Sequence, residues 1–225
     1  FNEINRARPQ MHSLLLRLMA ERSVTAFNRT FEFPYMQVYA DRNRVEKEET
    51  FELPAAARDR FLMEIAVEAP VEADVRRQLV FDPRFHDTET LLQVINAPAF
   101  DFKALAVCAP LIQKSIHASE ALQTYVVRLW DAVVRPAAAG IAVRGVDTGR
   151  LVQGGGSPRG IAFAVRAARV RAWLEGRDML VPEDIRDVFI ETMAHRIFLD
   201  PIYEMRREEI VRDLCTAVLA GVPAP

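Results

Sequence analysis

The chain opens with nine residues that decide its fold: Phe1-Asn2-Glu3-Ile4-Asn5-Arg6-Ala7-Arg8-Pro9. An apolar residue followed at once by polar side chains, and then by a helical pattern, is typical of the carboxyl end of a buried strand. Ligands of open α/β sheets bind at that edge. We therefore expect Glu3 at the strand tip, where its carboxylate could orient or deprotonate a water molecule. The alternative at this point is a solvated carboxylate that caps the following helix.

Bulk properties exclude several classes of protein. Half of the 225 residues are apolar, which is enough for one large core or two small ones. The net charge of -2 gives no sign of a nucleic-acid-binding surface. No apolar run approaches the ~18 to 20 residues that a membrane span needs, and charges at the start argue against a signal peptide. Cys108 and Cys215 lack a CxxC spacing. We expect two buried free thiols in a cytoplasmic protein.

The sequence has no phosphate-binding loop of the form G-x-x-x-x-G-K-[S/T]. The glycine-rich stretch at 154–160 comes nearest, but it lacks the lysine and the hydroxyl residue that follows it. Any triphosphate-binding activity would therefore need a phosphate loop supplied from elsewhere.

The order of patterns predicts an α/β part followed by an all-α part, divided at residues 1–68 and 69–225. In the first part we expect a helix at 8–22 that buries a stripe from Met11 to Met19, a hairpin at 24–33, and strands at 36–40 and 62–67. We expect His12 on the surface of the first helix. The helices of the second part are marked by apolar stripes, for example over 121–134, after Ser157-Pro158, after Val181-Pro182 and beyond Asp200-Pro201. Trp130 and Trp173 are expected in the core.

Four short motifs in order carry a family resemblance: Asn2 to Ala7, Met19 to Thr25, Asp59-Arg60-Phe61 and Gly156-Ser157-Pro158-Arg159. Together they resemble MoxR-type AAA+ ATPases, from the Walker B region to about Arg196. The resemblance implies a partial AAA+ P-loop NTPase core, strands 3 to 5, with a C-terminal helical lid domain. It also implies that the half with the phosphate loop is not in this chain, which we interpret as a piece of a longer protein.

The resemblance assigns roles at the sheet edge. Glu3 would polarise the water that attacks ATP. Asn43 would be the sensor-1 residue that positions this water or contacts the γ-phosphate, although Arg44 stands where the family has proline. Asn2 stands where the family has the aspartate that supports Mg²⁺, so it offers only a neutral oxygen.

Two arginines complete the implied site. Arg60 matches the finger that reaches a neighbouring subunit's nucleotide, with Arg58 as the alternative. Arg159, in the first turn of a helix, matches the sensor-2 arginine that contacts the γ-phosphate. The alternative for Arg60 is an ordinary salt bridge, and for Arg159 an arginine that merely lies near a helix start, where its charge opposes the helix dipole.

The resemblance thus implies an ATPase that uses ATP and Mg²⁺ in a homo-oligomeric ring, a hexamer. It implies chaperone-like maturation or activation of a client protein, possibly a metalloenzyme, with a von Willebrand A-type partner. The hairpin at 24–33 would point to the ring's pore, unless it is a plain surface hairpin. Alternatives are a non-hydrolysing AAA+-like scaffold or adaptor, favoured by Asn2, a helical interaction module, and a related motor of the rubisco-activating or magnesium-chelatase type. We also expect residues 1–68 to need the missing strands to fold.

Overall fold

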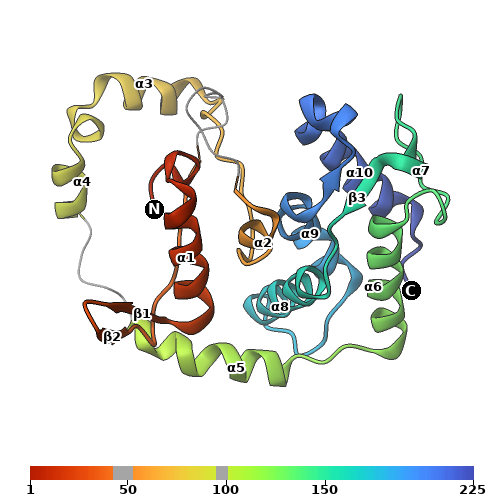
Figure 1. Cartoon of the computed structure of the whole chain (residues 1–225), viewed down its shortest axis with the longest axis horizontal. Helices are drawn as coiled ribbons and strands as arrows, with labels where there is room; N and C mark the ends of the chain where they lie inside the picture. Colours follow the sequence, from red (N-terminus) through yellow and green to blue (C-terminus); the bar gives the residue numbers. More distant parts are fainter. Residues whose placement is uncertain (43–52, 95–100) are drawn as a thin grey trace. The chain divides into compact units, whose positions relative to one another are not determined.

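The computed structural model describes residues 1–42, 53–94 and 101–225 (Figure 1). Asn43 therefore lies outside the described residues. The chain divides into two compact units, one formed by Phe1–Glu64 with Ala109–Pro225 and the other by Ile65–Cys108. None of the helices in the described ranges has the length and apolar character needed to cross a lipid bilayer.

The start of the chain pairs with the segment at 39–41. The amino group of Phe1 donates to the carbonyl of Tyr39 at 2.8 Å, and the amide of Asp41 donates back to the carbonyl of Phe1 at 3.0 Å. The amide of Ile4 also donates to the carbonyl of Asp41 at 2.9 Å. This is the hydrogen-bond pattern of neighbouring parallel strands. It brings the segment of Glu3 beside the segment that leads to Asn43.

A short 3-10 turn, η1 (Ile4–Arg6), leads into α1 (Pro9–Glu21), which has proline at its start as expected. The predicted buried stripe on this helix is correct in part. Leu15 is buried and Leu18 and Met19 are partly buried, but Met11 and Leu14 are 46% and 40% exposed. The buried partner of Leu15 on this face is His12, three residues earlier, which we expected on the surface. His12 reaches the Ile4 turn from this face, since its Nε2 lies 2.9 Å from the carbonyl of Ile4.

The predicted hairpin is confirmed as β1 (Ser23–Ala26) and β2 (Arg29–Glu32), an antiparallel pair. Its two turn residues, Phe27 and Asn28, have φ angles of 51° and 58°. Positive φ at both central residues is the signature of the tight turns that match strand twist. Phe27 is 99% exposed at this tip.

The strands expected at 36–40 and 62–67 do not form, and both segments lie outside the helices and strands of the structure. In the described part of the chain, the sheets are β1 with β2, and β3 (Val152–Gly154) with β4 (Phe198–Leu199). The segment after Phe61 bonds to helices instead, since the amide of Glu64 donates to the carbonyl of Glu191 at 2.9 Å. In this segment a helix carbonyl and the side chain of Arg196 bind the backbone in place of a neighbouring strand, whereas Tyr39 keeps its hydrogen bond with Phe1.

The second unit contains α3 (Ala73–Phe81), η2 (Pro83–His86), α4 (Thr88–Val94), η3 (Phe102–Ala104) and the first turn of α5 (Leu105–Ser115). No described residue of this unit is buried. Cys108, which we expected to be buried, is exposed because it lies in the first turn of α5, where none of the residues is buried. The described residues of this unit therefore form helices without an apolar core.

The helices of the larger unit enclose one apolar core. They are α6 (Glu120–Val134), α8 (Pro158–Leu174), α9 (Pro182–Met193) and α10 (Arg207–Gly221), with α2 (Ala55–Arg58), α7 (Thr148–Leu151), η4 (Ala194–Arg196) and η5 (Pro201–Arg206) at the edges. Figure 1 shows α8 and α9, which pack against each other, beside α6 and α10. The core includes Leu122, Tyr125, Leu129, Ala164, Ala168, Ile185, Phe189, Ile210, Leu214 and Val218.

The helical stripes predicted for this part are therefore confirmed. Trp130 packs against the core, but Trp173, expected there too, is 50% exposed near the end of α8. Cys215 is fully buried as expected, and burial raises its pKa to about 12, so the thiol stays protonated.

Candidate functional site

Glu3 sits in a constrained turn between the paired segment and α1. Its φ of 49° is left-handed, which is uncommon for a residue other than glycine. Its amide donates to Oδ1 of Asp41 at 2.6 Å, and its carboxylate lies 3.0 Å from Nε of Arg6. The side chain of Glu3 is 44% exposed. The backbone is thus held from the neighbouring segment while the carboxylate can still meet solvent.

His12 holds the same turn from the other side. Its Nε2 lies 2.9 Å from the carbonyl of Ile4, and the ring is only 2% exposed. Because a carbonyl can only accept, Nε2 must donate, which assigns the proton to that nitrogen. The position next to Glu3 is therefore supported by a buried side chain that sequence periodicity had placed on the surface.

The predicted metal position, Asn2, lies in the segment that pairs with residues 39–41. Asn2 is exposed, and the Asp41 carboxylate belongs to the segment paired with it. Within the described ranges, no group of three or more His, Cys, Asp or Glu side chains is arranged to hold a metal ion. The predicted sensor residue Asn43 lies outside the described residues.

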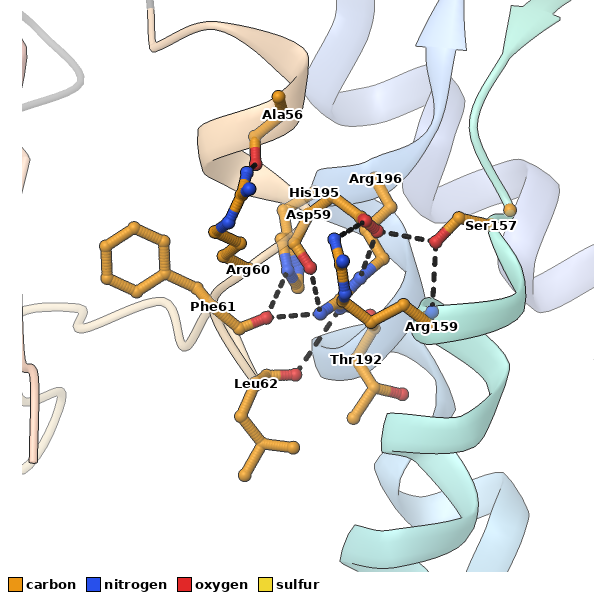
Figure 2. Close-up of polar contacts among 12 residues, drawn as sticks. Ala56, Asp59, Arg60, Phe61, Leu62, Ser157, Arg159, Thr192, His195 and Arg196 are labelled. Atoms are coloured by element: carbon orange, nitrogen blue, oxygen red, sulfur yellow. Dashed lines mark hydrogen bonds and ion pairs between the residues drawn. The ribbon is translucent and has the colours of Figure 1, made fainter. Parts of the chain in front are cut away.

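A second cluster gathers around Asp59, the residue that ends α2 (Figure 2). Oδ1 of Asp59 accepts from Oγ of Ser157 at 2.6 Å and from Nε of Arg196 at 3.2 Å. Oδ2 accepts from Nη1 of Arg159 at 2.7 Å. One carboxylate, 18% exposed, thus joins the end of α2 to the start of α8 and to η4.

Arg196 is buried at 1% exposure, which is unusual for a charged side chain. Its guanidinium donates to the carbonyls of Asp59 at 3.3 Å and Leu62 at 3.4 Å, and also to those of Phe61 and Thr192. Desolvation lowers its pKa, while the Asp59 carboxylate acts in the opposite direction. These acceptors satisfy a charge that would otherwise be very unfavourable inside the protein.

His195 precedes Arg196 and binds the same segment. Its Nε2 lies 3.3 Å from the carbonyl of Phe61, and the ring is 3% exposed. Burial, together with the charge of Arg196, lowers the pKa of His195 to about 4. The ring is therefore neutral at pH 7 and acts as a packing and hydrogen-bonding group.

The two candidate finger arginines differ in their contacts. Nη1 of Arg60 donates to the carbonyl of Ala56 at 2.8 Å, within its own turn (Figure 2). The guanidinium of Arg58 lies over the ring of Phe198, 4.7 Å from its centre. Arg58 thus lies against β4, whereas the guanidinium of Arg60 contacts the backbone of the turn that carries it.

The structure brings Arg159 beside the segment of Arg60 and places Glu3 beside the approach to Asn43. None of these contacts links the two groups to each other. Sequence reasoning missed Asp59 and Arg196 as the residues that organise the second group. A signal was present in the glycines at 154–156, because a Cβ on Gly155 would overlap the carbonyl oxygen of Arg196. Such runs mark close backbone approach.

Comparison with known proteins identifies both parts of the chain. Residues 1–63 match the ATPase family associated with various cellular activities (AAA), and residues 147–214 match the AAA lid domain. Protein MoxR of Methylorubrum extorquens is 67% identical over all of this chain, and Protein MoxR of Paracoccus denitrificans is 56% identical. Chaperone MoxR1 of Mycobacterium tuberculosis is 33% identical over the full chain, which covers 56% of that protein.

The fold agrees with a solved structure. The crystal structure of a candidate ATPase from Cytophaga hutchinsonii superposes with a TM-score of 0.73 at 26% identity, over 100% of this chain and 65% of the other. This chain spans 66% of the length of each of the two MoxR proteins. The fold is that of a partial AAA+ core followed by a helical lid, as the motifs predicted. The chain belongs to the MoxR family of AAA+ ATPases.

Proposed function

We propose that this chain is the Walker B-to-lid portion of a protein that hydrolyses ATP and uses the energy to mature or activate a client protein. The observation that carries the proposal is the Glu3 turn, with its left-handed backbone held by Asp41 and by the His12 contact to Ile4. Strained backbone that several neighbours hold in place is a feature of catalytic positions. In this proposal residues 1–68 belong to the nucleotide-binding domain and residues 69–225 to the lid.

The proposed roles follow the charges at each position. Glu3 accepts a hydrogen bond from the attacking water and orients it, helped by Asn43. Arg159 contacts the γ-phosphate of the same subunit, and Arg60 contacts the nucleotide of a neighbour, so the proposal includes a ring, with six subunits the expected number. The phosphate loop is supplied by sequence outside this chain.

The metal that accompanies ATP would neutralise charge on the phosphate oxygens. Mg²⁺ usually keeps several waters and takes few protein ligands besides substrate phosphates. Such binding with few protein ligands suits this edge, which offers the amide oxygen of Asn2 and the carboxylates of Glu3 and Asp41. The described side chains here do not suit a metal held by protein ligands alone. The client, a von Willebrand A-type partner, and a cytoplasmic location are further parts of this proposal. The name of Chaperone MoxR1 supports the chaperone part.

The deciding experiment is Glu3→Gln in the full-length protein. We expect the rate of ATP hydrolysis to fall by at least about 100-fold while ATP still binds. The amide keeps the shape of the side chain but cannot accept a proton from the attacking water. Steady-state phosphate release and equilibrium binding of a fluorescent ATP analogue measure the two effects. Glu21→Gln, a helix-end residue paired with Arg17, is the matched control and should leave both unchanged. Unchanged turnover in Glu3→Gln would remove the catalytic assignment.

A second candidate function is favoured by Asn2, which replaces a carboxylate with a neutral amide. A non-hydrolysing scaffold of AAA+ architecture would bind ATP without turnover. The same phosphate-release assay separates the two functions when the unmodified protein is measured beside Asn2→Asp. A hydrolysing motor should already be active before this change, whereas a scaffold should show no turnover in the unmodified protein.

A further inference from the structure

We propose that Asp59 positions Arg159 for its contact with nucleotide, and that buried Arg196 fixes Asp59 in place. This rests on the proposed function, in which Arg159 is the residue that distinguishes ATP from ADP. Asp59 would then be a positioning residue, with no contact of its own to the nucleotide.

Arg196 is held in place by contacts on several sides. Its guanidinium is surrounded by backbone carbonyls from Asp59 to Leu62 and from Thr192. Its backbone is approached by Gly155, and a Cβ on Gly160 would lie 2.7 Å from its Cδ. Close packing on both sides and several acceptors hold the side chain in this conformation.

The side chain of Asp59 is held in turn by Arg196. Its Oδ1 is held by Nε of Arg196 and by Oγ of Ser157. The same Ser157 hydroxyl accepts from the amide of Gly160 at 3.1 Å and so caps α8. The carboxylate is therefore fixed to the first turn of α8, which is the turn that carries Arg159.

Arg159 meets this fixed carboxylate through a single nitrogen, Nη1, at 2.7 Å (Figure 2). The side chain of Arg159 is 47% exposed, and an ion pair with so much solvent contact adds little stability. The ion pair instead sets the orientation of Arg159. The guanidinium is planar, so a contact at one nitrogen fixes the direction of its other nitrogens.

The net positive charge of the cluster around Asp59 favours the binding of an anion. Asp59 contributes one negative charge, and Arg159 and Arg196 contribute two positive charges. The charge of Arg196 is enclosed, whereas that of Arg159 faces solvent in part. The surplus positive charge therefore resides on the arginine that an incoming phosphate can reach.

The test compares ATP with ADP in the full-length protein. Equilibrium binding of fluorescent ATP and ADP analogues gives the preference for ATP in the wild type, Asp59→Asn, Arg159→Ala and the double variant. We expect Asp59→Asn to reduce the preference by roughly tenfold, as for the loss of one hydrogen bond to a charged group. The double variant should match Arg159→Ala alone, because the two residues act through one contact.

Asp184→Asn is the control for general damage. Asp184 is fully buried and accepts from Arg171 at 2.8 Å and from Arg177 at 2.6 Å, so it is another carboxylate shared by two arginines. This variant should lower thermal stability without changing the preference for ATP. Asp59→Glu keeps the charge beside Arg196 and serves if Asp59→Asn does not fold, and its longer side chain should reduce the preference to a smaller extent.

The outcomes separate the two proposals. If the wild-type protein binds no nucleotide, both fail. If it prefers ATP and the preference is unchanged in Asp59→Asn or, where that does not fold, in Asp59→Glu, only the role of Asp59 is overturned. Tighter ATP binding in Asp59→Asn would also overturn it, since Asp59 would then compete with phosphate for Arg159.

Discussion

Arg196 and His195 show how two adjacent polar residues can be used inside a protein core. The arginine keeps its charge because a carboxylate and several carbonyls surround it, whereas the histidine is neutral because burial lowers its pKa to about 4. Both bind the carbonyl of Phe61. The segment after α2 is therefore fixed by hydrogen bonds from η4 and not by apolar packing alone.

The neutral state of His195 predicts acid-sensitive stability. Its pKa is about 4 in the folded protein, against 6.5 ordinarily, so only the unfolded chain takes up its proton between these values. Stability from this group is full above pH 6.5 and is lost as pH falls towards 4. With about 1.4 kcal/mol per pKa unit, the loss is on the order of 3 kcal/mol.

Denaturant unfolding at several pH values measures this effect. We expect His195→Gln to unfold with a shallower dependence on pH over this interval, because glutamine can donate to Phe61 and does not titrate. His86→Gln, at an exposed position, is the control and should keep the slope of the wild type. Equal slopes in wild type and His195→Gln would show that the ring is not the source.

At the scale of single residues, motifs in the sequence point to Glu3 and Arg159, whose catalytic and binding roles stay predictions. The structure shows an ion pair of Glu3 with Arg6 and one of Arg159 with Asp59. His12 and Arg196 could not be found in this way, because a buried polar side chain is recognisable only from its acceptors. Those acceptors are backbone carbonyls, which every sequence contains.

At the scale of elements, the start of α8 is closely packed against its neighbours. Ser157 caps the helix, and the indole of Trp130 donates to the carbonyl of Gly156 just before it. Gly155 has a φ of 108° and lies against the backbone of Arg196. The turn must therefore be glycine for two separate reasons, backbone conformation and lack of space.

Gly155→Ala should consequently be far more damaging than the same change at Gly140. Gly140 also has a positive φ, of 71°, but a Cβ there would meet nothing within 4 Å. We expect about 1 to 2 kcal/mol of destabilisation for Gly140→Ala from backbone strain. Gly155→Ala should lose at least about 3 kcal/mol, because Arg196 must also move. Thermal unfolding compares them, and equal losses would contradict the close approach.

Helices were predicted better than strands for a physical reason. The stripe from Leu122 to Val133 was correct because a helix satisfies its own backbone and shows its buried face in its periodicity. The segments at 36–40 and 62–67 also had strand-like patterns. A strand, however, needs a partner for its backbone, and no local pattern says which partner is present.

At the scale of the whole molecule, the apolar core is concentrated in the helical part. The buried core cluster runs from Ile112 to Val222, while the described residues of the first 64 contribute Ile4, Leu15 and Ala57 to the buried apolar set. The motifs predicted the family because each marks a chemical role. They could not predict the buried connection between the two parts, which depends on residues that no motif contains.

That connection has a consequence for the integrity of the chain. Asp59, Phe61 and Leu62 are bound to Arg196 without any contribution from the 44 residues of Ile65–Cys108, none of which is buried where the structure describes it. Limited proteolysis should cut first in this stretch. We expect two fragments on a denaturing gel but a single particle by size-exclusion chromatography, whereas an Arg196→Met protein should release its amino-terminal fragment.

Separation of the wild-type fragments would contradict this expectation. Where they stay together, the amino-terminal portion remains bound to the lid after the backbone is cut, through the contacts that Asp59 and Phe61 make with Ser157, His195 and Arg196.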